Sequence, residues 1–156
     1  MSKINVNDEN DRTNDYILSS FNALKEENHQ ALTHYHSINK YLLMSYDPQR
    51  LKHLGRLIAE GQRLAYDELY HSYEKILKVL VVNGSSKPRR VNTFEHIYGY
   101  FKDSLPQDEK KQFFHILNDY IEDKTDERHI LSVLKGYVDF YKEPYLATQT
   151  IFDMFE

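Results

Sequence analysis

The spacing of the apolar residues constrains the fold of this chain more than any other feature of its sequence. From Tyr16 onward, apolar residues recur every three or four positions, which is the spacing of one face of an α-helix. The clearest stripe consists of Leu69, Tyr73, Ile76, Leu77 and Leu80. No segment shows the alternation of apolar and polar residues that is typical of a half-buried strand. The sequence therefore predicts an all-α fold.

In the first half of the chain, helical stripes are separated by short breaks. Residues 1–14 are rich in Asn and Asp and carry no stripe, so we expect a disordered polar tail there and one all-helical domain over residues 15–156. The expected helices of this half cover residues 15–27, 29–45, 49–60 and 62–82. Residues 83–88, which read Asn-Gly-Ser-Ser-Lys-Pro, form the strongest break in the chain.

The second half begins with a capping pattern. Asn92 and Glu95 fit an Asn-x-x-Glu capping box, which predicts a helix start at Asn92. The buried face of that helix would consist of Phe94, Ile97, Phe101 and Leu105. The helix after Pro106 would point Phe113, Phe114, Leu117 and Ile121 inward. Thr125 is expected to cap a further helix, and Pro144 to open a short last one. Short connections between six to eight helices predict a single-domain antiparallel bundle.

The composition excludes several classes of chemistry. The 156 residues include no cysteine, which excludes disulfides, thiolate nucleophiles, cysteine-bound zinc and cysteine-held iron–sulfur clusters within this chain. Two Glu-x-x-His pairs are about as many as chance gives, so we predict no metal and no cofactor. There is no Gly-x-Ser-x-Gly elbow and no phosphate-binding loop. An enzyme is therefore not the first expectation, although the sequence leaves it open.

No apolar segment is long enough to cross a membrane or to act as a secretion signal. The longest apolar run, residues 79–82, is far shorter than the roughly 20 residues that a membrane-spanning helix needs. We therefore expect a cytoplasmic protein that does not enter a membrane.

Charge is distributed unevenly along the chain. Residues 34–111 hold thirteen basic and nine acidic residues, whereas residues 1–33 hold three and six, and residues 112–156 hold four and nine. A basic middle between acidic ends favours a local anion-binding surface. An ordinary solvated surface with uneven mixing of charges would give the same counts, so both interpretations stay open.

Four motifs occur in an order and at a spacing that resemble those of a known family. They are His36 with Lys40-Tyr41-Leu42-Leu43-Met44, Leu54-Gly55-Arg56-Leu57, Asn92-x-x-x-His96-x-x-Gly99-Tyr100-Phe101-Lys102, and Glu143-Pro144-Tyr145-Leu146-Ala147-x-Gln149. Together they make residues 30–153 resemble the YbgA-like family, a bacterial domain of unknown function. The chain departs from that pattern at Arg89-Arg90, where a Lys-His pair is expected, and at Thr93-Phe94, where a small aliphatic pair is expected.

The resemblance implies an accessory role. YbgA-like domains occur alone or fused to a cysteine-containing desulfidase domain that acts on thiolated uracil, including thiouridine in tRNA. A domain of this kind would hold RNA while another domain performs the chemistry. The alternative is a protein-interaction or self-associating module that docks on a separate desulfidase. The sequence does not decide the oligomeric state.

Two sets of residues are candidates for function. The first set would contact RNA phosphates and consists of Lys40, Arg56, Lys87, Arg89, Arg90 and Lys102. The second set, His36, Asn92 and His96, would form a small-molecule enzyme site if the fold brought these residues into one pocket. The simpler interpretation is that Asn92 caps a helix and His96 is a partly buried hydrogen-bonding residue. The RNA-binding interpretation requires no catalytic residue.

Overall fold

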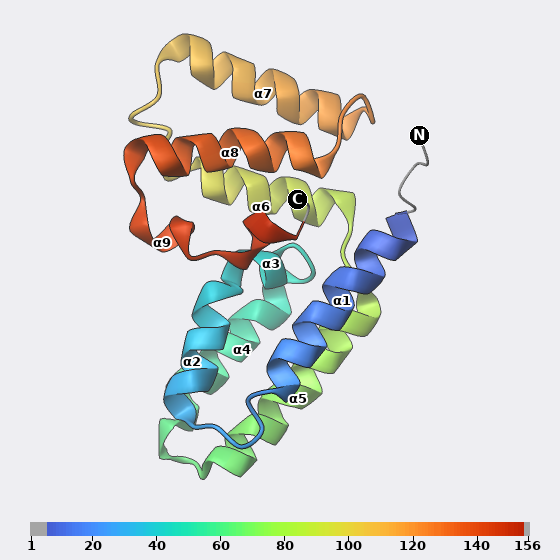
Figure 1. Cartoon of the computed structure of the whole chain (residues 1–156), viewed down its shortest axis with the longest axis vertical. Helices are drawn as coiled ribbons and strands as arrows, with labels where there is room; N and C mark the ends of the chain where they lie inside the picture. The colour runs from blue at the N-terminus through green and yellow to red at the C-terminus, as the bar shows by residue number, and fades with distance from the viewer. Residues whose placement is uncertain (1–5, 155–156) are drawn as a thin grey trace.

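The computed structural model describes residues 6–154 and is shown in Figure 1. Within these residues there are nine α-helices, two short 3-10 helices and no β-strand, which confirms the all-α prediction. The α-helices are α1 (Val6–Asn22), α2 (His29–Ile38), α3 (Lys40–Met44), α4 (Pro48–Glu60), α5 (Tyr66–Asn83), α6 (Lys87–Tyr98), α7 (Gln107–Ile121), α8 (Glu127–Tyr141) and α9 (Pro144–Ala147). The 3-10 helices are η1 (Gly61–Arg63) and η2 (Thr150–Asp153). None of the helices in residues 6–154 combines the length and the hydropathy needed to cross a membrane.

The helices form two sets whose axes cross (Figure 1). One set contains α1, α2, α4 and α5, of which α1 and α5 lie side by side. The other set contains α6, α7 and α8, stacked at the opposite end of the molecule. Helix α3 and the C-terminal segment lie between the sets, where α3 contacts α4, α6 and η2. The expected single bundle is therefore divided in two, and the two sets share one core.

Tyrosine and phenylalanine rings fill much of this core. Phe21 of α1 stacks on Tyr70 of α5, with 4.4 Å between the ring centroids, and also contacts the ring of Tyr73. In the other set, Tyr98 of α6 stacks on Phe113 of α7 at the same distance. Stacked and tilted aromatic pairs at such distances add to the free energy gained by burying the rings. Phe94, Ile97, Phe101 and Leu105 are buried as predicted, but α6 ends at Tyr98, so Phe101 and Leu105 lie in the connection after the helix rather than on its face.

Helix α1 begins earlier than the sequence predicts. The expected disordered tail covers residues 1–14, but the structure places residues 6–14 in α1, and residues 1–5 lie outside the described part of the chain. Thr13 is buried, and Asn14 accepts a hydrogen bond from the Tyr46 hydroxyl. Tertiary contacts therefore order a polar segment whose composition alone favours disorder, and the predicted boundary at residue 14 is corrected.

The helix expected over residues 29–45 is interrupted at Asn39, between α2 and α3. In a continuous helix the backbone N–H of Tyr41 would bond to the carbonyl oxygen of Ser37. Instead, the Gln149 side chain lies between them: its oxygen accepts from the Tyr41 N–H at 3.2 Å and its amide donates to the Ser37 oxygen at 2.8 Å. Gln149 and Asn39 are both buried, so the opened backbone groups stay paired away from water.

Helix α6 starts at Lys87, five residues before the predicted capping box. Ser86 is its N-cap and accepts from the Arg89 N–H at 3.4 Å. Pro88 lies in the first turn, where the missing N–H removes no helical hydrogen bond, so the proline helps to begin the helix rather than to separate two helices. Asn92 therefore lies inside α6, and the prediction that it is an N-cap is wrong.

Helix α7 buries a different face from the predicted one. Phe113 and Leu117 are buried as expected, but Phe114 and Ile121 are each 49% exposed. Ile116 and Tyr120 complete the buried stripe instead. Helix α7 lies at one end of the molecule, against α8 and α6, so only one of its faces is covered (Figure 1). At the start of α8 the N-cap is Asp126 rather than Thr125, whereas Pro144 opens α9 as predicted.

Candidate functional site

A pocket of about 580 Å³ lies where α2, α3, α4 and α6 meet. It is lined by His36 of α2 and by Asn92 and His96 of α6, so the structure brings together the three polar candidates. Lys40 of α3, one of the predicted phosphate contacts, lines the same pocket. Lys52 of α4 supplies a fifth polar side chain that the sequence analysis does not select.

Helical geometry explains why these side chains converge. Asn92 and His96 are four residues apart on α6, so they lie on one face of that helix, and α6 packs against α3. His36 and Lys40 lie on either side of the interruption between α2 and α3. Because α6 starts at Lys87, Asn92 is not used as a cap and its side chain lines the pocket. The crossing of the two helix sets thus creates the site.

Part of the lining is apolar and comes from α3 and α4. Met44 and Leu51 are buried core residues at the edge of the pocket, and Pro48 is half-buried beside them. Gly55 continues the α4 side, and a Cβ atom there would lie 3.4 Å from Nε2 of His36. The imidazole of His36 therefore lies against the α4 backbone, with Nε2 next to the pocket.

His36 is held in its neutral form. Burial, with a smaller contribution from the positive charge of Lys40, lowers the pKa of His36 to about 4. Its Nδ1 atom lies 3.0 Å from the hydroxyl of Tyr73, which is fully buried and whose pKa burial raises well above the ordinary value. Within the described residues the structure gives that hydroxyl no other acceptor, so we assign its O–H as the donor to Nδ1. The ring hydrogen of His36 is then on Nε2, where it can be donated into the pocket.

The charged groups around the pocket are cationic. Among the described residues no carboxylate lines the pocket, and none forms an ion pair with Lys40, Lys52 or Arg56. Arg56 is exposed and lies one turn after Lys52 on α4, so the two side chains share a face. We call Lys40, Lys52 and Arg56 the cationic group. Its charges are available to an anion from outside the chain.

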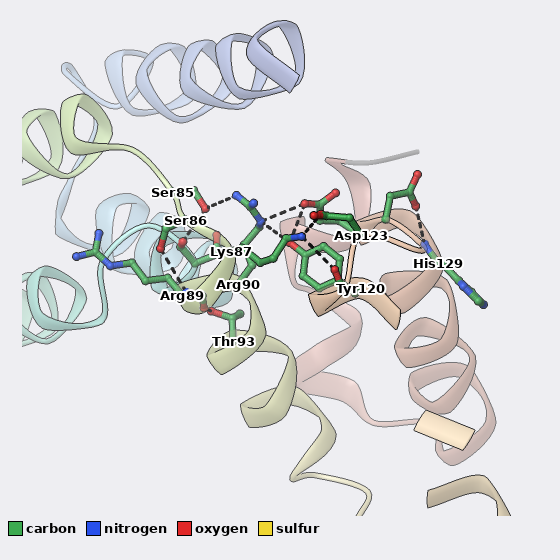
Figure 2. Close-up of polar contacts among 12 residues, drawn as sticks. Ser85, Ser86, Lys87, Arg89, Arg90, Thr93, Tyr120, Asp123 and His129 are labelled. Carbon is green, nitrogen blue, oxygen red and sulfur yellow. Dashed lines mark hydrogen bonds and ion pairs between the residues drawn. The ribbon is translucent and has the colours of Figure 1, made fainter. Parts of the chain in front are cut away.

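The basic residues at the start of α6 are used differently (Figure 2). The Lys87 ammonium forms an ion pair with Asp123, donates to the Tyr120 carbonyl oxygen at 3.1 Å and lies 5.0 Å from the centroid of the Tyr120 ring. These contacts join the first residue of α6 to the end of α7 and to the connection that follows it. Lys87 therefore holds two helices together.

The Arg90 side chain is bound by three other side chains of the protein. Its Nε atom lies 3.1 Å from the Glu127 carboxylate and donates to the Tyr120 hydroxyl at 2.7 Å, while its Nη1 atom donates to Ser85 at 3.0 Å. The side chains of Arg90 and Glu127 are only 15 and 18% exposed. This network fixes α6 against α7 and α8 and leaves the guanidinium little access to a ligand.

The remaining two basic candidates do not extend the pocket. Arg89 donates to the Tyr46 carbonyl oxygen at 2.6 Å, and its charge helps to lower the pKa of Asp47. Lys102 is exposed in the connection after α6 and does not line the pocket. The six predicted phosphate contacts are thus not brought together: Lys40 and Arg56 belong to the cationic group, and the three at the start of α6 bind the chain's own groups.

Three contributors to the site are missed by the sequence analysis. Lys52 could have been selected from the sequence, because it precedes Arg56 by one helical turn and therefore shares a helix face with it. Tyr73 could not, since it belongs to the most regular core stripe and its contact with His36 depends on the packing of α2 against α5. Gly55 stands in one of the four motifs but is recognisable as part of a pocket only from the structure. No group of three or more potential metal ligands occurs among the residues that the structure describes.

The fold and this pocket define an all-α domain with a polar pocket, lined by two lysines, at the crossing of two helix sets. The model of a family described as protein of unknown function, DUF1722, matches residues 40–155, and the chain belongs to this family. The matched region contains every pocket residue except His36, which lies just before it. No curated protein and no solved structure matches the chain.

Proposed function

We propose that this protein is an accessory module that binds structured RNA such as tRNA, in connection with thiouridine metabolism, and performs no chemistry of its own. The observation that carries the proposal is the cationic group of Lys40, Lys52 and Arg56, which no carboxylate of the described residues neutralises. The resemblance to YbgA-like domains, which occur fused to desulfidases acting on thiolated uracil, supports the choice of RNA as the polyanion.

The cationic group is suited to the phosphate backbone rather than to one base sequence. Lys and Arg side chains that contact phosphates release bound counterions, so affinity falls as salt concentration rises. Such contacts position the nucleic acid but read little sequence. The convergence of His36, Asn92 and His96 meets the geometric condition for a small-molecule enzyme, and Lys and His can act as nucleophiles, but the most distinctive property of the lining is its unneutralised positive charge, which suits binding of an anion. We therefore propose binding without catalysis.

Fluorescence anisotropy with labelled tRNA over a series of salt concentrations tests this proposal. We expect binding at low salt, and we expect the Lys52→Ala/Arg56→Ala variant to reduce the slope of log affinity against log salt by about two, one for each lost phosphate contact. Lys111→Ala is the matched control, because Lys111 is exposed on α7, in the other helix set.

Two results would overturn the RNA proposal: no tRNA binding at low salt, or equal binding by the wild type and the double variant. A protein that co-purifies without a nucleic-acid signal in the ratio of absorbance at 260 and 280 nm would instead favour the docking alternative. Phe140 on α8 is 77% exposed and Phe114 on α7 is 49% exposed, which is the feature that supports docking on a partner protein.

A further inference from the structure

The size of the pocket indicates an organic ligand rather than a small inorganic ion. Its volume of about 580 Å³ lies within the range of roughly 300–1,000 Å³ that is usual for sites of small organic molecules. Such sites combine an apolar lining with a few polar groups that fix orientation. Here the apolar part comes from Met44, Pro48 and Leu51, and the polar part from α2 and α6.

The charges indicate what kind of organic ligand fits. Lys40 and Lys52 both line the pocket, and no carboxylate lines it among the described residues, so a cationic ligand would find no counter-charge and an anionic group would find two. A phosphate group matches two ammonium groups better than a single carboxylate, since it carries more charge and more acceptor oxygens. The ligand is therefore expected to carry a phosphate.

The neutral polar groups indicate what the rest of the ligand offers. The Nε2–H of His36 is a donor, and the Asn92 amide is both donor and acceptor, while His96 adds a further ring nitrogen. This combination pairs with a planar group whose edge carries both carbonyl oxygens and N–H groups or ring nitrogens. The face of such a group can pack on Met44 and Leu51. A nucleobase has these properties.

We propose that the pocket binds one nucleotide unit, with its phosphate between Lys40 and Lys52 and its base edge at His36, Asn92 and His96. The unit comes either from a free nucleoside monophosphate or from an unpaired position of an RNA strand. If the nucleotide belongs to an RNA strand, the inference rests on the RNA-binding function proposed above. If the nucleotide is free, the inference rests on the pocket alone.

Isothermal titration of the full chain with UMP, AMP, uridine and inorganic phosphate tests the inference. We expect a nucleoside monophosphate to bind roughly tenfold or more tightly than uridine or phosphate alone, because neither of these makes both sets of contacts. Asn92→Asp is nearly isosteric, but it replaces the amide donor at the base edge with a carboxylate that only accepts, and it adds a negative charge to a pocket that must hold a phosphate, so it should weaken binding roughly tenfold or more. Lys52→Ala should weaken it similarly, and Lys111→Ala should not change it.

Competition separates the two sources of the nucleotide. Displacement of labelled tRNA by the monophosphate shows that an RNA nucleotide occupies the pocket, whereas monophosphate binding without displacement assigns the pocket to the free nucleotide. The inference is overturned if neither monophosphate binds, or if Asn92→Asp binds as tightly as the wild type while its circular dichroism spectrum and melting temperature are unchanged. Salt-dependent tRNA binding in that case leaves the proposed RNA function intact. Monophosphate binding without any tRNA binding overturns the RNA function alone.

Discussion

His36 shows how one buried residue links the stability of the fold to the chemistry of its pocket. Its imidazole lies between the Tyr73 hydroxyl on one side and the pocket on the other, and burial keeps the ring neutral. A neutral ring can donate from Nε2 without adding a third positive charge beside Lys40 and Lys52. The cost is that protonation of His36 is disfavoured in the folded state.

We expect the free energy of unfolding to decrease as the pH falls from about 6.5 to about 4. In that interval His36 takes up a proton in the unfolded chain, where its pKa is ordinary, but stays neutral in the folded chain, where its pKa is lowered to about 4. The loss should be about 2–3 kcal/mol, and less if water enters from the pocket side. Urea unfolding at pH 7.5, 6, 5 and 4 measures it.

The matched variant for this experiment is His36→Gln. Glutamine does not titrate and can still accept a hydrogen bond from Tyr73, so the variant should lack this part of the pH dependence. Identical pH dependence in both proteins would contradict the assignment of a neutral, buried His36.

At the scale of a single helix, Asp47 fixes the start of α4, the helix that carries Lys52 and Gly55. Its carboxylate accepts from the backbone N–H groups of Gln49 and Arg50 at 3.0 and 3.1 Å and forms an ion pair with the Arg50 side chain at 2.7 Å. Burial alone would raise the pKa of Asp47, but these hydrogen bonds and the charges of Arg89 and Arg50 outweigh it and hold the pKa below its usual value.

We expect Asp47→Ala to reduce the free energy of unfolding by about 2–3 kcal/mol, because it removes a buried cap and leaves the Arg50 charge without its partner. Asp126→Ala is the matched control, since Asp126 caps α8 from an exposed position through one bond of 3.3 Å to His129. Its loss should be about 1 kcal/mol or less. Thermal or urea unfolding compares the two. Equal losses would show that the burial of Asp47 contributes nothing.

The existence and type of most helices could be predicted from the sequence, but several of their boundaries could not, among them the start of α6 and the interruption between α2 and α3. Regular apolar stripes, as on α5, depend only on the local sequence, and the folded protein buries them as predicted. The start of α6 was missed because Ser86 and Pro88 form a start signal that also resembles a break. The interruption at Asn39 could not be predicted for a different reason. It is stabilised by Gln149, which contacts Tyr41 from 108 residues away, and no local sequence pattern predicts such a contact.

On the scale of the whole molecule, the candidate site could be predicted only as separate pieces. The sequence selected His36, Asn92 and His96 by motif, and the structure places them in one pocket. Arg90 was also a candidate because of its charge. The charge alone does not reveal that the Arg90 side chain is already bound to Glu127 and Tyr120. Which cations remain available depends on how the two helix sets cross, and that is a property of the complete core.

We expect Gln149→Ala to reduce the free energy of unfolding by about 1–3 kcal/mol, because the buried Tyr41 N–H would lose its partner, while the Ser37 carbonyl would keep its bond from the Tyr145 hydroxyl. Thr148→Ala is the matched control, since the Thr148 side chain is exposed and bonds only locally to the Tyr145 carbonyl oxygen among the described residues. Urea unfolding measures the difference between the variants.

The same variant pair tests whether the Gln149 side chain holds the α2–α3 junction in place. Amide hydrogen exchange over residues 37–45 should be faster in Gln149→Ala than in the wild type, and unchanged in Thr148→Ala. A Gln149→Ala protein as stable as the wild type, with unchanged exchange in that segment, would show that the Gln149 side chain is not what holds the junction.

The hydrogen bonds of Gln149 also set an order of events during synthesis. Gln149 follows Ser37 by 112 residues, which a ribosome adding about 5–20 residues per second needs roughly 6–20 seconds to complete. Until Gln149 has been made, the junction of α2 and α3 lacks the side chain that pairs its open backbone groups. The side chains of Lys40 and Met44 are therefore among the first of the pocket to be made and among the last to reach their final positions. A nascent chain would gain its ligand-binding ability only after Gln149 has left the ribosome and reached this junction.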